Sequence, residues 1–207
     1  MTIARALLMA SRTVRLEYIG ESAAVGATTL ALPAHQAGDL LVVLYVSSGA
    51  SASIPSDWTT LFNNSGSRTY GAYKIAESDA ETVGNWSTIY SYTRRFSFVW
   101  RGANDQSPVG AVSYRYSGDY EKLIFPAITA DNARSWLVCI GGAATSYLPF
   151  TDGGAPTDFP GMTLRFNASQ WRRAWDSDGP KGSLGATTID TNDAVYLAVC
   201  LEITPKT

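Results

Sequence analysis

The sequence predicts an all-β protein built as a double-sheet β-sandwich. Charged residues make up only 16% of the 207-residue chain, whereas hydrophobic residues reach 45%. The composition is rich in β-branched and aromatic side chains, which pack well on a pleated surface. Short apolar or alternating runs follow one another between turn residues, and no stretch keeps a helical period for long. Roughly ten to twelve strands at this close spacing are typical of a sandwich or barrel.

The first half of the chain contains the clearest strand signals. Residues 13–19 alternate apolar and polar side chains, which predicts a half-buried strand closed by Gly20. A second strand is predicted at 28–32, before Pro33. The continuous apolar run 39–46 predicts a central strand covered on both faces. Further strands are expected at 68–75 and 95–101.

The second half repeats the order of elements seen in the first. Strands are expected at 109–116, 123–128, 135–140 and 194–203. Segments of about 38–101 and 135–203 share a strand, a loop with Pro, an aromatic turn and two later strands. We therefore predict one jelly-roll-like sandwich domain over 13–207, made of two related sheet units. A split into two domains near 103–108 is the alternative, and 1–12 is expected to contact a partner.

Charge and hydropathy argue against two classes of partner. The net charge is -2 with a pI near 5.4, and the pairs Arg94–Arg95 and Arg172–Arg173 are isolated, which favours solvated strand ends over a nucleic-acid surface. No apolar run approaches the roughly 20 residues that span a bilayer. The opening residues 1–10 are too short for a secretory signal, so we expect synthesis in the cytoplasm.

The two cysteines lie inside apolar runs. Cys139 and Cys200 are therefore expected to be buried free thiols that pack as small hydrophobic groups. A disulfide between them stays open as an alternative, because it depends on whether their strands are neighbours. Neither a metal-ligand spacing nor a Cys-x-x-Cys motif is present.

Catalytic and metal-binding signals are weak. The chain has no Gly-x-Ser-x-Gly motif that would supply a nucleophilic serine for His35 to activate as a base. We therefore expect His35 to be an exposed loop histidine. Glu77 and Asp176 occupy equivalent places in the two repeats and would have to face each other in a glycosidase, but both resemble solvated loop acids. Asp176 and Asp178 are weak calcium candidates, since the remaining ligands of a calcium loop are missing. We predict no enzyme activity, no metal and no cofactor.

Aromatic residues divide into two groups. Trp58 and Trp100 are expected in the core. Others lie beside polar loops or between arginines, and Trp and Tyr suit protein or sugar contacts because they combine an apolar face with a polar group. The residues that we predict to face a partner or ligand are Trp171, Arg172, Arg173, Trp175, Trp86, Tyr90 and Tyr92.

Several motifs of the chain resemble a family of small β-rich virion proteins of tailed bacteriophages and prophages. The motifs that carry the likeness are structural, and they cover most of residues 15–203. They are Gly38-Asp-Leu-Leu-Val-Val43, Pro55-Ser-Asp-Trp58, Tyr73-Lys-Ile-Ala76, Phe98-Val-Trp-Arg101, Ser135-Trp-Leu-Val138, Pro160-Gly-Met-Thr163 and the strand 195–203. The segment 171–175, rich in Trp and Arg, departs from the family pattern.

This resemblance implies a structural role in the virion, as a capsid decoration, collar, tail or fibre protein. The expected partners are copies of the chain itself and other virion proteins, with no nucleic acid and no membrane. Its location would be the virion, after synthesis in the host cytoplasm. A lectin-like domain that binds host-surface glycan is the main alternative, and a glycan hydrolase is a third.

Overall fold

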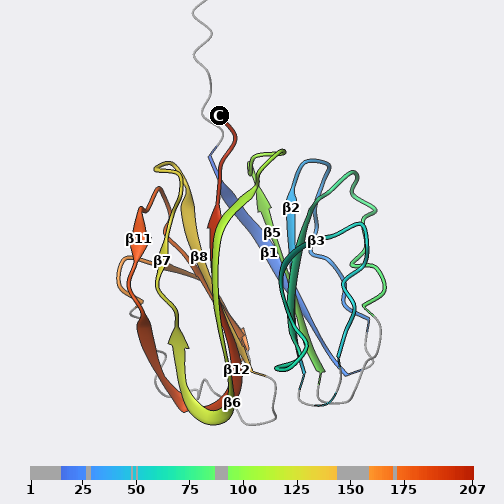
Figure 1. Ribbon diagram of the computed structural model, residues 1–207. Helices are drawn as coiled ribbons and strands as arrows, with labels where there is room; N and C mark the ends of the chain where they lie inside the picture. The colour runs from blue at the N-terminus through green and yellow to red at the C-terminus, as the bar shows by residue number, and fades with distance from the viewer. Residues whose placement is uncertain are drawn as a thin grey trace, which may run out of the picture.

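The protein consists of two antiparallel β-sheets packed face to face, as the computed structural model shows (Figure 1). The structure describes residues 15–26, 29–47, 49, 51–86, 93–143, 159–169 and 172–207. These residues form twelve strands and no helix. The predicted all-β double-sheet sandwich is therefore confirmed.

The first sheet contains strands from the N-terminal half of the chain, in the order β1-β5-β2-β4-β3. Their bounds are β1 (Glu17–Val25), β2 (Leu40–Ser47), β3 (Thr59–Asn64), β4 (Thr69–Ile75) and β5 (Thr93–Arg101). The second sheet has the order β6-β12-β8-β10-β9. Its bounds are β6 (Val109–Phe125), β8 (Trp136–Ala143), β9 (Thr163–Ser169), β10 (Arg172–Asp176) and β12 (Thr187–Ile203).

The two sheets share one topology. Replacing β1, β2, β3, β4 and β5 by β6, β8, β9, β10 and β12 converts the first strand order into the second. A small extra sheet of β7 (Ile128–Thr129) and β11 (Ser183–Leu184) belongs to the second half alone. The pairing registers of the two sheets correspond as well. Val43 pairs with Ser97 in the first sheet, and at the equivalent position of the second sheet Cys139 pairs with Cys200.

The main core lies between the two sheets. Alternate residues of β2 and β5 face it from one side, including Val42 and Phe98, and residues such as Val138 and Leu201 face it from the other. The approach is close at Gly142, where the Phe96 ring of the opposite sheet occupies the space that a side-chain methyl would need. Both halves of the chain therefore contribute to one shared core.

Each sheet also has an apolar outer face, which loops cover. On the first sheet, Trp58 and Trp86 pack over Tyr45 and Val43. On the second, Phe125 and Phe159 lie in the same cluster as Cys139 and Trp175. As a result every residue of β2 and β8 is buried. This confirms the prediction of a central strand at 39–46 that is covered on both faces.

Three local predictions differ from the structure. Gly20 does not end the first strand, because the register of β1 against β5 shifts between Tyr18 and Gly20 and pairing then continues to Val25. The glycine therefore marks a bulge. Residues 29–32 form no strand; Leu30 instead packs into the outer cluster of the first sheet. The strands predicted at 109–116 and 123–128 belong largely to one long strand, β6.

A buried carboxylate, Glu202, fixes the loop before β8. Its side chain is fully buried and accepts backbone N–H bonds from Ala111, Asp131 and Asn132 at 2.8–2.9 Å. Burial alone would raise the pKa of Glu202, but hydrogen bonds from Ser135 and these backbone groups outweigh it and lower the pKa. Gly110 leaves the room that the carboxylate occupies.

Glu202→Gln tests this interaction through the pH dependence of stability. A lowered folded-state pKa means that the carboxylate stabilises the fold above its unfolded pKa of about 4.3, and that this contribution is lost as the pH falls through the folded-state value. We expect the variant to lose about 2 kcal/mol of unfolding free energy at pH 7 and to approach the unaltered protein at acidic pH. Urea unfolding at a series of pH values from acidic pH to pH 7 measures the free energy of unfolding of both proteins. A difference between the two proteins that stays the same at every pH would contradict the stabilising role of the Glu202 carboxylate.

Candidate interaction site

An ion network connects the two sheets where β1 approaches β9 and β10. The Arg165 guanidinium of β9 donates to the buried Asp176 carboxylate at 2.8 Å and to Asp178 at 2.6 Å. Arg15 donates to the same Asp178 oxygen at 2.9 Å. Hydrogen bonds to Asp176 raise the pKa of Arg165, and the hydrogen bond from Arg165 lowers the pKa of Asp178.

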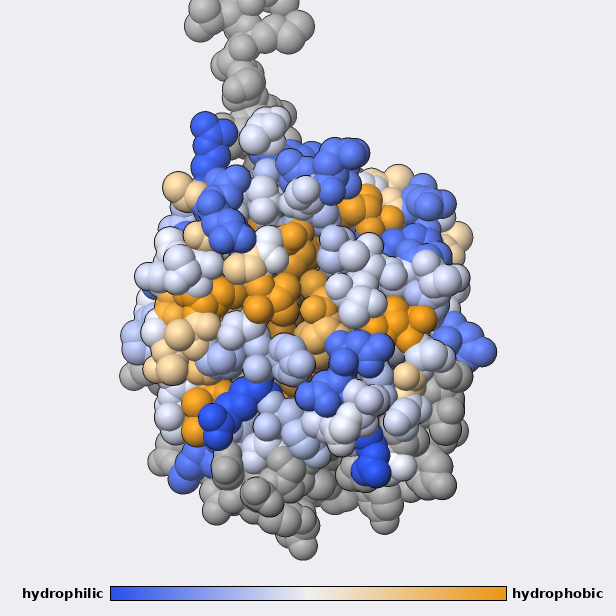
Figure 2. All heavy atoms as spheres, viewed as in Figure 1, coloured by the Kyte–Doolittle hydropathy of each residue, from blue (hydrophilic) through white to orange (hydrophobic). Residues whose placement is uncertain are grey.

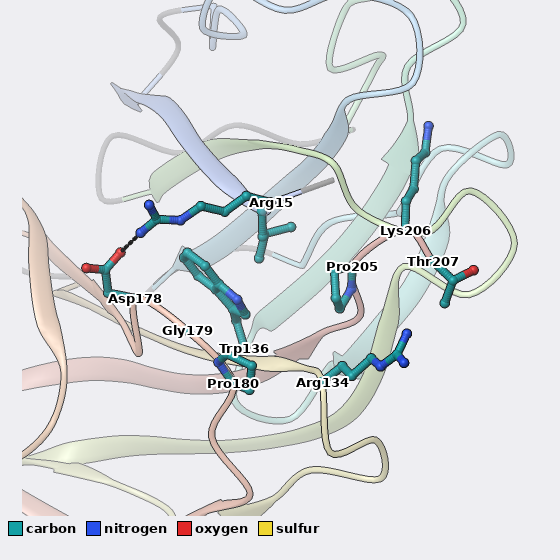
Figure 3. A pocket seen from close by; sticks show the side chains of 10 residues that line it. Arg15, Arg134, Trp136, Asp178, Gly179, Pro180, Pro205, Lys206 and Thr207 are labelled. Atoms are coloured by element: carbon teal, nitrogen blue, oxygen red, sulfur yellow. Dashed lines mark hydrogen bonds and ion pairs between the residues drawn. The ribbon is translucent and has the colours of Figure 1, made fainter. Parts of the chain in front are cut away.

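The same network closes one side of a pocket of about 640 Å³. Its apolar lining comes from Leu16, Trp136, Pro180 and Pro205 (Figure 3). Polar side chains at its margin are Arg15, Arg134, Asp178, Lys206 and Thr207. The volume lies within the range of small-molecule sites, and an apolar lining with a few polar groups is their usual composition.

Local backbone geometry fixes the acidic wall of this pocket. Asp178 has a φ of 47°, in the left-handed region, and its N–H donates to the Asp176 carboxylate at 2.9 Å. On the neighbouring strand, the Leu137 N–H donates to the Ser177 hydroxyl and the Ser177 N–H returns a bond to the Leu137 carbonyl. Arg15 lies over the Trp136 ring, with its guanidinium carbon 5.9 Å from the ring centre.

A second candidate surface lies where the edge strands β3 and β6 meet. We call it the β3–β6 seam, and it consists of Leu61, Phe62, Val112, Tyr114 and Tyr116. The Phe62 and Tyr114 rings stack with their centres 4.3 Å apart, and the other three pack partly buried against the inter-sheet core. Tyr114 is 36% exposed and, with Val25, is one of two large exposed hydrophobic residues in the described ranges. Figure 2 shows apolar atoms gathered along the middle of this face.

The predicted partner-facing aromatic residues that the structure describes are in the core. Trp175 is fully buried and packs edge-on against Phe125 and Phe159. Trp86 is buried, stacks on Tyr45 and donates its indole N–H to the Val83 carbonyl at 2.9 Å. Their predicted exposure is wrong, because both complete the outer layers that cover the sheets. Trp58 and Trp100 are buried as expected.

The arginine pairs also differ from the prediction of solvated strand ends. Arg94, Arg95 and Arg173 are buried, and this burial lowers the pKa of each guanidinium. Arg173 therefore does not face outward to a partner as expected. The side chain of Arg172 and the residues Trp171, Tyr90, Tyr92 and 1–12 lie outside the described part of the chain.

The acids and the histidine have local partners. Asp176 is buried against Arg165, whereas Glu77 is exposed and its N–H donates to Glu81. The positive charge beside Asp176 and Asp178 comes from the chain's own arginines, and the described residues contain no group of three or more His, Cys, Asp or Glu placed to hold a metal. His35 is half-buried, with Nδ1 2.7 Å from the Pro33 carbonyl oxygen.

Sequence reasoning named Asp178 only as a weak calcium candidate and missed the other pocket residues. Arg15, Trp136, Asp178 and Lys206 come from four separate segments, so no linear motif unites them. The repeat offers one signal that could have pointed to the pocket. Trp136 of the second copy is equivalent to Leu40 of the first, because their strands pair in the same register, so a large aromatic side chain replaces an aliphatic one at this position.

The fold and these surfaces define the chain as an all-β two-sheet sandwich protein with a pocket at one sheet junction and an apolar seam at the other. Comparison with protein-family models, curated proteins and solved structures finds no match. In the ranges that the structure describes, no helix is long and apolar enough to cross a membrane.

Removing Arg165 tests the ion network. Arg165→Met leaves the Asp176 carboxylate buried without its cation, which we expect to lower the free energy of unfolding by about 3 kcal/mol. The double variant Arg165→Met with Asp176→Asn should recover much of this loss, because the uncompensated charge is gone. Urea unfolding of four proteins at pH 7, namely the unaltered chain, the single variants Arg165→Met and Asp176→Asn, and the double variant, measures the coupling. Additive losses from the two substitutions would show that the pair does not act as a unit.

Proposed function

We propose that this protein is a structural component of a tailed-phage virion that acts by protein–protein assembly, with a second copy of the same chain as one partner. The observation that carries the proposal is the β3–β6 seam. It combines an exposed aromatic ring with partly buried apolar residues where the edge strands of the two sheets meet. The likeness of the strand and turn motifs to virion proteins supports the same assignment.

The shape of the edge favours a strand from another copy as the occupant of the seam. β6 spans 17 residues, well beyond the usual five or six, and it stands at the edge of the strand order of the second sheet. A long edge strand is a template for a strand of another chain. Two copies related by a two-fold axis would place β6 against β6, so that each buries the seam of the other. The low charge content of the chain, 16%, limits repulsion between them.

Light scattering coupled to size-exclusion chromatography tests this assembly. We expect the full chain to form a dimer or larger closed oligomer at micromolar concentration. Tyr114→Glu should shift it towards monomer, because it places a charge in the buried seam. Val25→Glu is the matched control: it adds the same charge to the other exposed hydrophobic position, on β1, and should leave the oligomer intact. Circular dichroism checks that both variants fold.

Two outcomes would contradict assembly through the seam. One is a monomer at every concentration, and the other is an oligomer whose mass does not change in Tyr114→Glu.

The pocket favours a second candidate function, binding of host-surface glycan. Trp136, Pro180 and Pro205 offer apolar contacts. Arg15 and Arg134 can donate hydrogen bonds to hydroxyl and carboxylate groups, and Asp178 can accept them from hydroxyl groups. Arg15 would have to move from the Trp136 ring; its side chain is 74% exposed, which permits this. The arginines favour a sugar acid over a neutral sugar.

Titration with sialic acid and glucuronic acid, followed by saturation-transfer NMR, tests the pocket. We expect weak binding of the acids, no binding of glucose, and at least tenfold loss of affinity in Arg134→Gln, about 1.4 kcal/mol. Glu77→Gln, an exposed site on the other half of the chain, is the control and should bind normally. This function would be ruled out if acidic and neutral sugars gave equal saturation-transfer signals. It would also be ruled out if Arg134→Gln bound the acids as well as the unaltered chain does.

A further inference from the structure

Two thiols meet at the centre of the second sheet. Cys139 of β8 and Cys200 of β12 face each other directly in the antiparallel pairing. Their Sγ atoms are 2.8 Å apart, and both residues are fully buried and in the free thiol form. A disulfide bond is about 2.05 Å long, so the sulfurs must approach by only roughly 0.8 Å to bond.

We propose that Cys139 and Cys200 are a covalent cross-linking site, closed by a small-molecule disulfide oxidant of the oxidised-glutathione class. One cysteine thiolate attacks the oxidant and releases one reduced thiol, giving a mixed disulfide. The second cysteine then attacks the protein sulfur of that intermediate and releases the other reduced thiol. Both cysteines lose a proton, one S–S bond forms in the protein, and the two electrons reduce the oxidant to two thiols.

The surroundings determine when this reaction takes place. Both sulfurs lie on the outer face of the sheet, within the apolar cluster that includes Trp175 and Phe125. Burial, together with the neighbouring Cys200 thiol, raises the pKa of Cys139 well above its ordinary value. Because the thiolate is the reacting form, the folded reduced protein resists oxidation. The bond closes during folding in an oxidising medium, or when the outer layer opens.

The cross-link would connect two neighbouring strands that lie inside the second sheet and are 61 positions apart in sequence. It would stabilise the chain chiefly by restricting the unfolded state. Such a bond suits a protein that leaves a reducing cytoplasm for an oxidising exterior. The inference depends on the register of β8 and β12 and not on the proposed virion role.

The test compares the full chain refolded with reduced or with oxidised glutathione. Thiol labelling after denaturation, read by mass spectrometry, should find two labels in the reduced preparation and none in the oxidised one. Peptide mapping should recover a Cys139–Cys200 link. The oxidised protein should melt on the order of 10 °C higher in differential scanning calorimetry, and reductant added under denaturing conditions should abolish the difference.

The control is the double variant Cys139→Val with Cys200→Ser, which copies the Val43–Ser97 pair at the equivalent register of the first sheet. Its melting temperature should not depend on the redox buffer. Two labels in the oxidised preparation of the unaltered chain, or equal melting temperatures with and without the bond, would overturn the proposal. Thiol labelling is carried out on the unaltered chain. It therefore tests the proposal even if the double variant does not fold.

Discussion

The structure depends on burying its two central strands on both faces. β2 and β8 carry apolar residues at nearly every position, so packing the sheets against each other covers only half of their side chains. Each sheet therefore needs an outer layer as well. Loops supply it with large aromatic rings, Trp58 and Trp86 on one side and Phe159 on the other. This need for two extra layers accounts for much of the aromatic content of the chain.

Layers made of loops must be held in place, and buried carboxylates do this. Asp39 precedes β2, accepts two hydrogen bonds from Arg101 at 2.8–2.9 Å and one from the Gln36 N–H at 2.9 Å. Glu202 and Asp176 hold loops of the second sheet through N–H groups close in space. A carboxylate buried in this way is stable only while its donors remain. Asp176, which the sequence analysis considered for catalysis and for metal binding, thus has a structural role in holding a loop.

The sequence predicted what depends on local pattern and missed what depends on distant contacts. The apolar run 39–46 identified a doubly covered strand, because no half-exposed strand tolerates such a run. Trp175 was misassigned, since its polar neighbours in sequence suggest exposure while its spatial neighbours, Phe125 and Phe159, come from distant segments. The pocket and the seam were equally invisible, because each joins residues of different strands. Pairing of the sheets, not local pattern, creates them.

The two junctions between the sheets join equivalent strands but differ in their side chains. Equivalent strands place β3 beside β6 at one junction and β9 beside β1 at the other. The first is filled by the Phe62–Tyr114 stack, whereas the second holds the Arg15–Asp178–Arg165 network and opens into a pocket. The strand registers preserve the common framework, since Asp39–Arg101 in one half is matched by Ser135–Thr204 in the other. The two halves of the chain therefore share their strand order and differ in chemistry at the edges of the sheets.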